Sequence, residues 1–473
     1  MFQVAIAFLF QLFILKIFGI TENLDIYFAS NTINMIIVGV ATSALNYSTT
    51  PIFITYFKSK KLKTFKNLAN SLLSLLFILF LMLALIQSIF ASQITATIFP
   101  GFSGEDNILI SKMFAIQAFI SIVSILIGIL NAINYTFNNL YRTVIIPIVG
   151  SVLQIGFVYF TYESLGVFSL VYALGLFQVF VFIGLSASFV KYYRFRIKID
   201  ENLKDAWIKM YPLILSSSFS KSDILLDRYF ASTLIAGSIT ILHYGQLFIN
   251  ILTTFVNNGI SLVSLRKFST IVEDKEKFNN YFLSLYQIML VISMFFVVQI
   301  VLASDTVLYY LLDGDILSME KLEMLYVVIV SLLGVFFGGI LSSVLVNAFY
   351  SKGLTSLVSK MSIILHTLGI VVKIVAFKLY GFYALVVVMS IKSILASILL
   401  VWLYNIHIYK IDYMHFILFF CKVFFVSVFI LIVSLYLKSI EINIFALIAV
   451  SSLVYIALYY KFLKSKYLVM KRG

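Results

Sequence analysis

Charged and hydroxylated residues interrupt an otherwise apolar part of the chain, in the segment YPLILSSSFSKSDILLDRYFAS at residues 211–232. In a helix, side chains follow one another at about 100°, which places these polar groups on two adjacent stripes. The stripes carry Ser216, Ser220, Asp223 and Asp227, and beside them Lys221 and Arg228. Ammonium and guanidinium groups on one face attract an anion, and guanidinium suits phosphate because it binds in bidentate fashion. The carboxylates would hold the bases in place or exchange protons or cations.

The same charges permit a structural interpretation, in which a buried network of ion pairs only holds helices together. Under either interpretation the helix must line a polar seam or an aqueous cavity, because a charge in hydrocarbon costs at least about 2.5 kcal/mol. A helix that enters the membrane at Tyr211 places Lys221 and Asp223 near the membrane centre, at a rise of about 1.5 Å per residue.

Five more charges lie within or at the ends of apolar stretches, and one of them, Lys422, lies about two turns from the inner surface and is expected to extend to water. Lys392 stands in the middle of the stretch 382–404, where its stem does not easily reach water, so we expect it to face a wet cavity. Lys373 lies nearer the end of its stretch, and both a cavity and a surface position are open to it. Lys16 and Asp25 lie within about a turn of a membrane surface, which predicts that they extend to water. These two, with Ser216 and Ser220, are secondary candidates for substrate binding.

The elements that position these residues are membrane-spanning helices. Of the 473 residues, 62% are hydrophobic and 11% are charged, whereas charged residues approach a quarter of a soluble chain. The mean hydropathy is +1.07, and apolar runs of about twenty residues recur from end to end. We therefore predict an all-α membrane protein. The single cysteine, Cys421, excludes an internal disulfide.

Apolar stretches between polar clusters predict fourteen transmembrane helices, the first of them in place of a signal peptide because no basic leader or cleavage site is present. The predicted spans are 3–20, 26–55, 68–91, 108–134, 143–161, 166–190, 211–235, 241–265, 281–302, 324–349, 357–377, 382–404, 414–436 and 442–460. Lysine and arginine gather in alternate loops and in the C-terminal tail, which predicts that both termini are cytoplasmic. Topology thus explains the net charge of +14; recruitment of an anionic lipid or an acidic partner is the alternative.

Several functions are disfavoured by what the loops lack. The loops are short, and neither a G-x-x-x-x-G-K-[ST] phosphate loop nor an H-E-x-x-H zinc pair occurs. We therefore expect no cofactor, no metal and no intrinsic ATP-driven transport. Nucleic-acid binding is also not expected, because no soluble module exists to carry it.

Short sequence matches recur six helices apart. Gly128, Ile129 and Leu130 in the fourth span match Gly339, Ile340 and Leu341 in the tenth, and KIFG at residues 16–19 of the first span aligns with RYFA at 228–231 of the seventh. The match between LDIYFAS at residues 24–30 and LDRYFAS at 226–232 is out of this register, because the first opens the second span and the second closes the seventh. A repeat offset by an even number of helices relates two halves about an axis along the membrane normal, with the substrate site between them.

Motifs along spans one to ten resemble a known family. KIFGITENLDIYFAS, NYSTTPIFITYF, IFPGF at residues 98–102 and LDRYFASTLIAGSITILHYGQLF are similar, in order, to the lipid II flippases (MurJ-like) of the multidrug/oligosaccharidyl-lipid/polysaccharide (MOP) exporter superfamily. The resemblance implies two six-helix lobes in a V around a central cationic cavity, with alternating access. It places an N-terminal lobe at 1–200, a C-terminal lobe at 201–410, and at 411–473 two helices that form a lipid-tail groove, followed by a basic cytoplasmic tail.

The chain departs from the family in its basic residues. Arginines that the family places in the first, second and eighth spans are missing, and Lys373 stands near where a sodium-site carboxylate is expected. Cavity charge would come instead from Lys221, Arg228, Lys373 and Lys392, which suits a Wzx-like branch that handles surface-polysaccharide units.

The leading hypothesis is therefore a flippase, not an enzyme, that moves an undecaprenyl-diphosphate-linked saccharide across the bacterial inner membrane. The saccharide is a lipid II-like peptidoglycan precursor or a surface-polysaccharide repeat unit. The alternatives are a cation-coupled multidrug antiporter, whose cavity should be net acidic, and a membrane glycosyltransferase or acyltransferase, which needs catalytic groups in larger loops. The expected partners are the lipid-linked anionic saccharide and membrane lipids, with the protein as a monomer.

Overall fold

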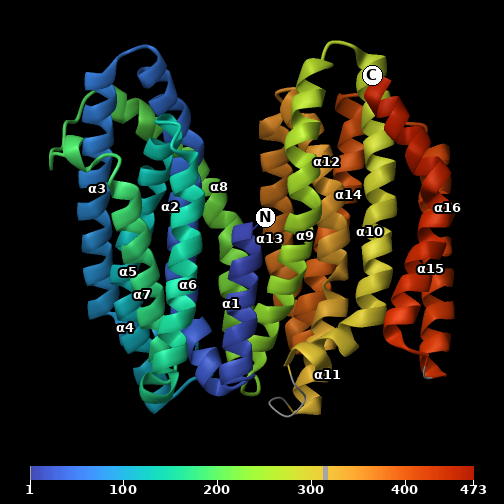
Figure 1. Cartoon of the computed structure of the whole chain (residues 1–473), viewed down its shortest axis with the longest axis horizontal. Coiled ribbons are helices and arrows are strands. Elements are labelled where there is room, and N and C mark those ends of the chain that lie inside the picture. Colours follow the sequence, from blue (N-terminus) through green and yellow to red (C-terminus); the bar gives the residue numbers. More distant parts are fainter. Residues whose placement is uncertain (1, 313–317, 441, 473) are drawn as a thin grey trace. The chain divides into compact units, whose positions relative to one another are not determined.

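The computed structural model describes residues 2–312, 318–440 and 442–472, and these fold into helices with no strand (Figure 1). The structure does not describe the side chains of a few residues within these helices: 2, 3, 47, 220, 258–262, 311, 312 and 468–472. In chain order the helices are α1 (Phe2–Phe18), α2 (Glu22–Lys58), α3 (Leu62–Ile89), α4 (Ala91–Ile98), α5 (Glu105–Thr136), α6 (Leu140–Leu165), α7 (Phe168–Ser186), a 3₁₀ turn (Val190–Tyr192), α8 (Glu201–Ser232), α9 (Ser238–Thr270), α10 (Lys275–Leu312), α11 (Met319–Ser331), α12 (Leu333–Ser351), α13 (Thr355–Tyr380), α14 (Phe382–His407), α15 (Tyr413–Ser439) and α16 (Ile444–Arg472).

Twelve membrane spans are found among the described residues by length and apolar composition, with α11 and α12 counted as one span. The predicted count of fourteen is therefore not confirmed. The two remaining predicted spans are α1, whose apolar stretch Val4–Phe18 is short, and α8, in which charges and serines interrupt the apolar run. The predicted span 324–349 is interrupted at Leu332, where α11 ends and α12 begins.

The chain divides into two compact units, Met1–Thr240 and Ile241–Gly473. In the first unit α5 is central, because it packs against α2, α3, α4, α6 and α7. Its core is built from aliphatic side chains and from rings that meet edge to face, such as Phe53 and Phe65 at 5.2 Å between centroids. The units divide after Thr240, whereas the sequence predicts a lobe boundary at residue 200. The difference arises because α8 packs along α2 and also contacts α3.

In the second unit α10 and α14 organise the packing. Helix α14 packs against α12 and α13, while α10 packs against α12, α15 and α16. Phe282 of α10 and Tyr404 of α14 stack with their ring centroids 3.9 Å apart. The last two helices, α15 and α16, thus join this unit mainly through α10.

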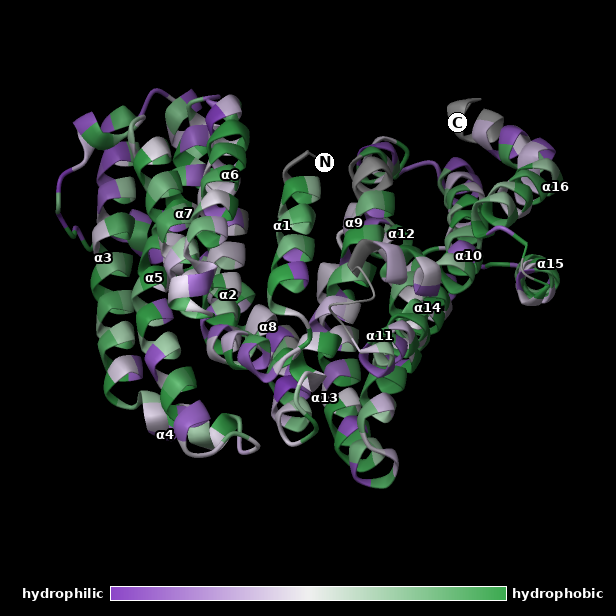
Figure 2. Ribbon diagram, turned by 60° about the horizontal axis from the view of Figure 1, so that its bottom comes forward, coloured by the Kyte–Doolittle hydropathy of each residue, from purple (hydrophilic) through white to green (hydrophobic). Residues whose placement is uncertain are grey.

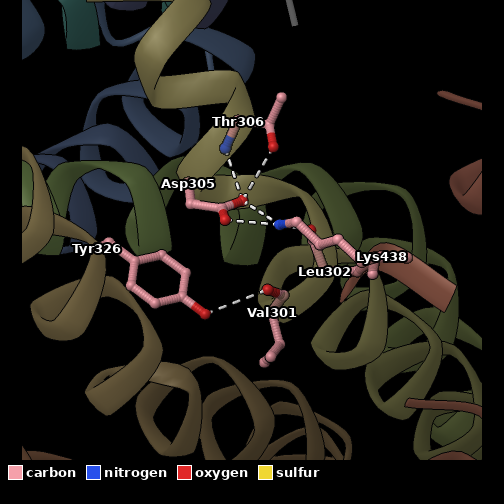
Figure 3. A network of polar contacts seen from close by, with 6 residues as sticks. All are labelled: Val301, Leu302, Asp305, Thr306, Tyr326 and Lys438. Atoms are coloured by element: carbon pink, nitrogen blue, oxygen red, sulfur yellow. Dashed lines mark hydrogen bonds and ion pairs between the residues drawn. The ribbon is translucent and has the colours of Figure 1, made fainter. Parts of the chain in front are cut away.

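A polar network holds the end of α10 to its neighbours (Figure 3). Lys438, in the last turn of α15, donates to both carboxylate oxygens of Asp305 at 2.7 and 2.6 Å and to the carbonyl oxygen of Leu302 at 3.0 Å. Tyr326 of α11 donates to the carbonyl oxygen of Val301 at 3.4 Å. The same end of α10 is therefore tied to α11 and to α15.

Two glycines allow α12 to approach α14 closely. A Cβ atom at Gly338 would lie 2.5 Å from the backbone carbonyl carbon and oxygen of Ser393, and one at Gly334 would lie 2.5 Å from Cβ of Ser390. Small residues four apart let helix backbones come together in a membrane, where van der Waals contact drives much of the association. At Gly339, by contrast, an added Cβ would make an ordinary 3.7 Å contact with Thr253.

We predict that Gly338→Ala destabilises the protein by about 1–3 kcal/mol, because the new methyl group overlaps a backbone that cannot yield easily. The matched variant Gly339→Ala should be neutral or slightly stabilising, since alanine is the better helix former. Thermal unfolding of the purified protein in detergent measures both. Equal unfolding temperatures for the two variants would show that the α12–α14 approach does not require Gly338.

Candidate functional site

Helix α8 carries the polar face that the sequence singled out. It is visibly more polar than the green helices α3 and α14 (Figure 2). The N-terminus of α8 is capped by Asp200, which accepts a hydrogen bond from the backbone of Leu203 at 3.1 Å. Its middle part is exposed, with Tyr211, Leu215 and Phe219 all accessible, whereas its C-terminal half is buried against α2.

The candidate residues of α8 differ in their exposure. Asp223, Asp227 and Arg228 are buried, and each has partners. Ser216 is exposed and donates to the carbonyl oxygen of Leu213 in its own helix. The side chain of Ser220 lies outside the described residues. The polar stripe is thus continuous in sequence but only its C-terminal half is enclosed by protein.

Lys221 is half-buried and extends across Gly39 of α2. Its Cε and Nζ atoms lie 3.5 and 3.6 Å from the position of a Cβ at Gly39. Among the described residues, its ammonium group has no hydrogen-bond or ion-pair partner. Of the two cations on the polar face at residues 211–232, Lys221 is therefore better placed than the buried Arg228 to meet an external anion.

Asp25 is buried and caps a helix. One carboxylate oxygen accepts from the backbone N–H of Gly237 at 2.6 Å, and the other accepts from the N–H and hydroxyl of Thr240 at 2.7 and 2.6 Å. These donors belong to the start of α9, where N–H groups lack partners within the helix and the helix dipole favours a negative charge. Gly237 permits the approach with a φ of 98°. The prediction that Asp25 extends to water is wrong, because it is 3% exposed.

Arg228 lies beside this cap. Its Nη1 donates to the carbonyl oxygen of Ile239 at 2.5 Å, and the guanidinium interacts electrostatically with Asp227 and Asp25. We call Asp25, Asp227, Arg228 and the α9 backbone at residues 237–240 the Asp25 cluster. It joins the start of α2, the end of α8 and the start of α9.

A loop before α5 closes on the same place. Gly101, in the sequence IFPGF, contacts the end of α8 so closely that a Cβ there would lie 1.6 Å from the carbonyl oxygen of Ser232. Only glycine fits this position. The motifs LDIYFAS, IFPGF and LDRYFAS, which are far apart in the sequence, therefore meet at one end of the first unit.

A second set of candidates lies in the other unit. Lys392 of α14 extends over Gly369 of α13, and its Nζ lies 3.4 Å from Nδ1 of His366. Lys373 of α13 is 1% exposed and has partners. Lys16, by comparison, is exposed in the last turn of α1.

The structure thus brings Asp25, Asp227 and Arg228 together, and it pairs Lys392 with a histidine. His366 was not predicted as part of the site. Helices α13 and α14 are joined through Gly381 alone, and His366 and Lys392 lie fifteen and eleven residues from that glycine, so they differ by about one helical turn and their spacing gives only a coarse signal of the contact. The role of Gly237 and Thr240 had no such signal, since a cap supplied from another helix leaves no local pattern.

Comparison with known proteins identifies the family. The sequence profile described as "Lipid II flippase MurJ" matches residues 14–457. No curated protein matches the sequence. The solved "Lipid II flippase MurJ, inward closed conformation" is 18% identical with a TM-score of 0.84, and 98% of each chain is covered.

Two other solved structures extend the comparison to the superfamily. An inward-facing multidrug resistance MATE family transporter of the MOP superfamily is 16% identical with a TM-score of 0.73, covering 86% of this chain and 94% of that one. A MOP superfamily transporter from Pyrococcus furiosus is 18% identical with a TM-score of 0.62, covering 86% and 93%. These likenesses establish the fold, and they confirm the predicted class of all-helical membrane protein. Because the profile spans nearly the whole sequence, the chain belongs to the lipid II flippase MurJ family.

Proposed function

We propose that the protein moves an undecaprenyl-diphosphate-linked saccharide from the inner to the outer leaflet of a bacterial plasma membrane. Membership of the flippase family carries this proposal. The substrate is a lipid II-like peptidoglycan precursor or a surface-polysaccharide unit, and no covalent chemistry takes place. Both termini are cytoplasmic, in keeping with the lysines and arginines in alternate loops, and the protein acts as a monomer.

The diphosphate is the part of the substrate that the charged residues recognise. Lys221 offers a half-buried ammonium group without a partner among the described residues. Lys392 offers a half-buried ammonium group whose Nζ lies 3.4 Å from Nδ1 of His366. A desolvated ammonium binds phosphate oxygens strongly because both partners are ionised. Arg228 is already engaged by the carbonyl of Ile239 and by two carboxylates, so we assign it to holding the helices in position.

Alternating access requires one end of each lobe to open while the other stays closed. The Asp25 cluster is suited to such a closed end, because the Asp25 carboxylate joins the start of α2 to the start of α9, and Arg228 joins the end of α8 to the same part of α9. A cation-coupled multidrug antiporter is the alternative that the MATE-like fold leaves open. The balance of charge favours the anion carrier: Lys221, Arg228, Lys373 and Lys392 outnumber Asp223 and Asp227.

We predict that Lys221→Glu and Lys392→Glu each slow translocation by about tenfold or more, because each loses a charge-assisted contact worth about 1.5–3 kcal/mol and adds repulsion. The assay is the movement of fluorescent lipid II, or of an undecaprenyl-diphosphate oligosaccharide, in vesicles that contain the purified protein. Lys112→Glu, a reversal at an exposed site in the first turns of α5, is the control. Wild-type translocation rates in both test variants would contradict the proposal that these lysines bind the diphosphate.

We also predict that Asp25→Asn lowers the thermal unfolding temperature and the transport rate together. The change removes the negative charge from the α9 cap and turns one acceptor into a donor that faces N–H groups, at a cost of about 2 kcal/mol. Glu22→Gln, an exposed change in the first turn of the same helix, should leave both quantities unaltered. An unfolding temperature unchanged by Asp25→Asn would show that the Asp25 cluster does not stabilise the protein.

A further inference from the structure

An extended segment between the 3₁₀ turn and α8 combines basic and apolar side chains. Its sequence at residues 193–199 is YRFRIKI, and it runs beside α3 as the green segment without helix in Figure 1. The basic residues Arg194, Arg196 and Lys198 alternate along it with four apolar residues. We call this segment the basic strap.

The basic strap is fastened to α3 by its backbone. The N–H groups of its three basic residues each donate to a buried polar side chain of α3: Arg194 to Asn70 at 3.3 Å, Arg196 to Ser74 at 3.2 Å and Lys198 to Ser71 at 3.0 Å. Asn70 also donates to the carbonyl oxygen of Tyr192 at 3.2 Å. These bonds use the backbone. Nη1 of Arg194 also donates to the carbonyl oxygen of Tyr193 at 2.9 Å, but a guanidinium group carries five N–H donors, so donors of the exposed Arg194 and Arg196 side chains remain available for an external ligand.

An apolar cavity opens beside the strap. It has a volume of about 390 Å³ and is bounded by α3, α5, α7 and the strap itself. Its walls include Leu73, Phe77, Leu130, Tyr193 and Phe195. All three helices qualify as membrane spans, so the cavity lies within reach of lipid chains. A cavity of this size and lining accepts a hydrocarbon chain but offers little to a polar ligand.

The exposed apolar side chains and the cations of the basic strap indicate which kind of ligand binds beside the cavity. Phe195 and Ile199 are 62% and 75% exposed, as expected for side chains that enter the edge of a bilayer. Lys66 adds a further cation where it lies over the Tyr192 ring, 3.8 Å from its centroid. The nearby acid, Asp200, pairs with Lys198 at 3.6 Å and leaves Arg194 and Arg196 to dominate the local charge.

We propose that the basic strap and this cavity form a binding site for an anionic phospholipid, with the headgroup phosphate at Arg194 and Arg196 and an acyl chain in the cavity. Arginine suits the headgroup because its planar fork binds phosphate in bidentate fashion. An acidic protein partner would use the charge but not the adjoining apolar cavity. The site lies on α3, α5 and α7, away from Lys221 and the Asp25 cluster, and it does not depend on the proposed transport function.

Thermal unfolding of the full chain in detergent tests the proposal. Added phosphatidylglycerol should raise the unfolding temperature, whereas phosphatidylcholine with the same chains and free glycerol phosphate should not. The double variant Arg194→Gln/Arg196→Gln should need about thirtyfold more phosphatidylglycerol for the same shift, since each basic residue near an anionic surface contributes about 1 kcal/mol. Lys461→Gln/Lys464→Gln, which removes equal charge from exposed positions of α16, should respond like the wild type.

A second variant tests the cavity without altering the charge. Ser186 lines the cavity at the end of α7, so Ser186→Trp should fill it and abolish the response to phosphatidylglycerol. An undiminished phosphatidylglycerol response in both the double variant and Ser186→Trp overturns the proposal. An equal response to phosphatidylcholine overturns the role of charge, and an equal response to glycerol phosphate overturns the role of the lipid chain.

Discussion

A charge placed in hydrocarbon must find its partners inside the protein, and this constraint governs where the polar residues of the chain lie. The Asp25 carboxylate meets it by accepting three hydrogen bonds from the start of α9, and Arg228 meets it through a carbonyl oxygen and two nearby carboxylates. The Asp25 carboxylate thereby satisfies N–H groups at the start of α9 that would otherwise be unpaired in the membrane. The polar interactions that allow α8 to be buried are therefore the same ones that join α2, α8 and α9.

The class of the protein followed from composition because the bilayer imposes a length and an apolarity that few other environments require. Helix ends were predicted only to within a few residues, since a helix can continue beyond the membrane: α2 runs over Glu22–Lys58, four residues before and three residues beyond the predicted span 26–55. The polar helix α8 was recognised as unusual from its residues, and its C-terminal half is buried, as a polar face within a bundle requires. Its assignment to a lobe did not follow from the sequence, because packing along α2 depends on contacts between distant residues.

The sequence shows which charged residues lie in apolar stretches, but it does not show the geometry in which they meet. A buried charge is visible in a sequence, but its partner is not when that partner is a backbone group of another helix, as at Gly237. Close approaches are equally hidden. Gly101 fits against Ser232 only because it has no side chain, and nothing in the IFPGF motif itself names the residue that it contacts. Some residues of the motifs that carry the family resemblance therefore pack directly against one another.

Arg228 and Lys221 lie on the same helix, but their surroundings suit Arg228 to a structural role and Lys221 to ligand binding. Arginine presents a planar array of donors that several acceptors can saturate at once, and Arg228 is 3% exposed among such acceptors. Lysine keeps a compact charge on a flexible stem, and Lys221 extends across Gly39 of α2 while remaining half-buried. A carrier must release its ligand as well as bind it, which a fully paired guanidinium buried in a bundle cannot do readily. The residue with an unused charge is accordingly the better candidate for meeting a phosphate that arrives and leaves in each cycle.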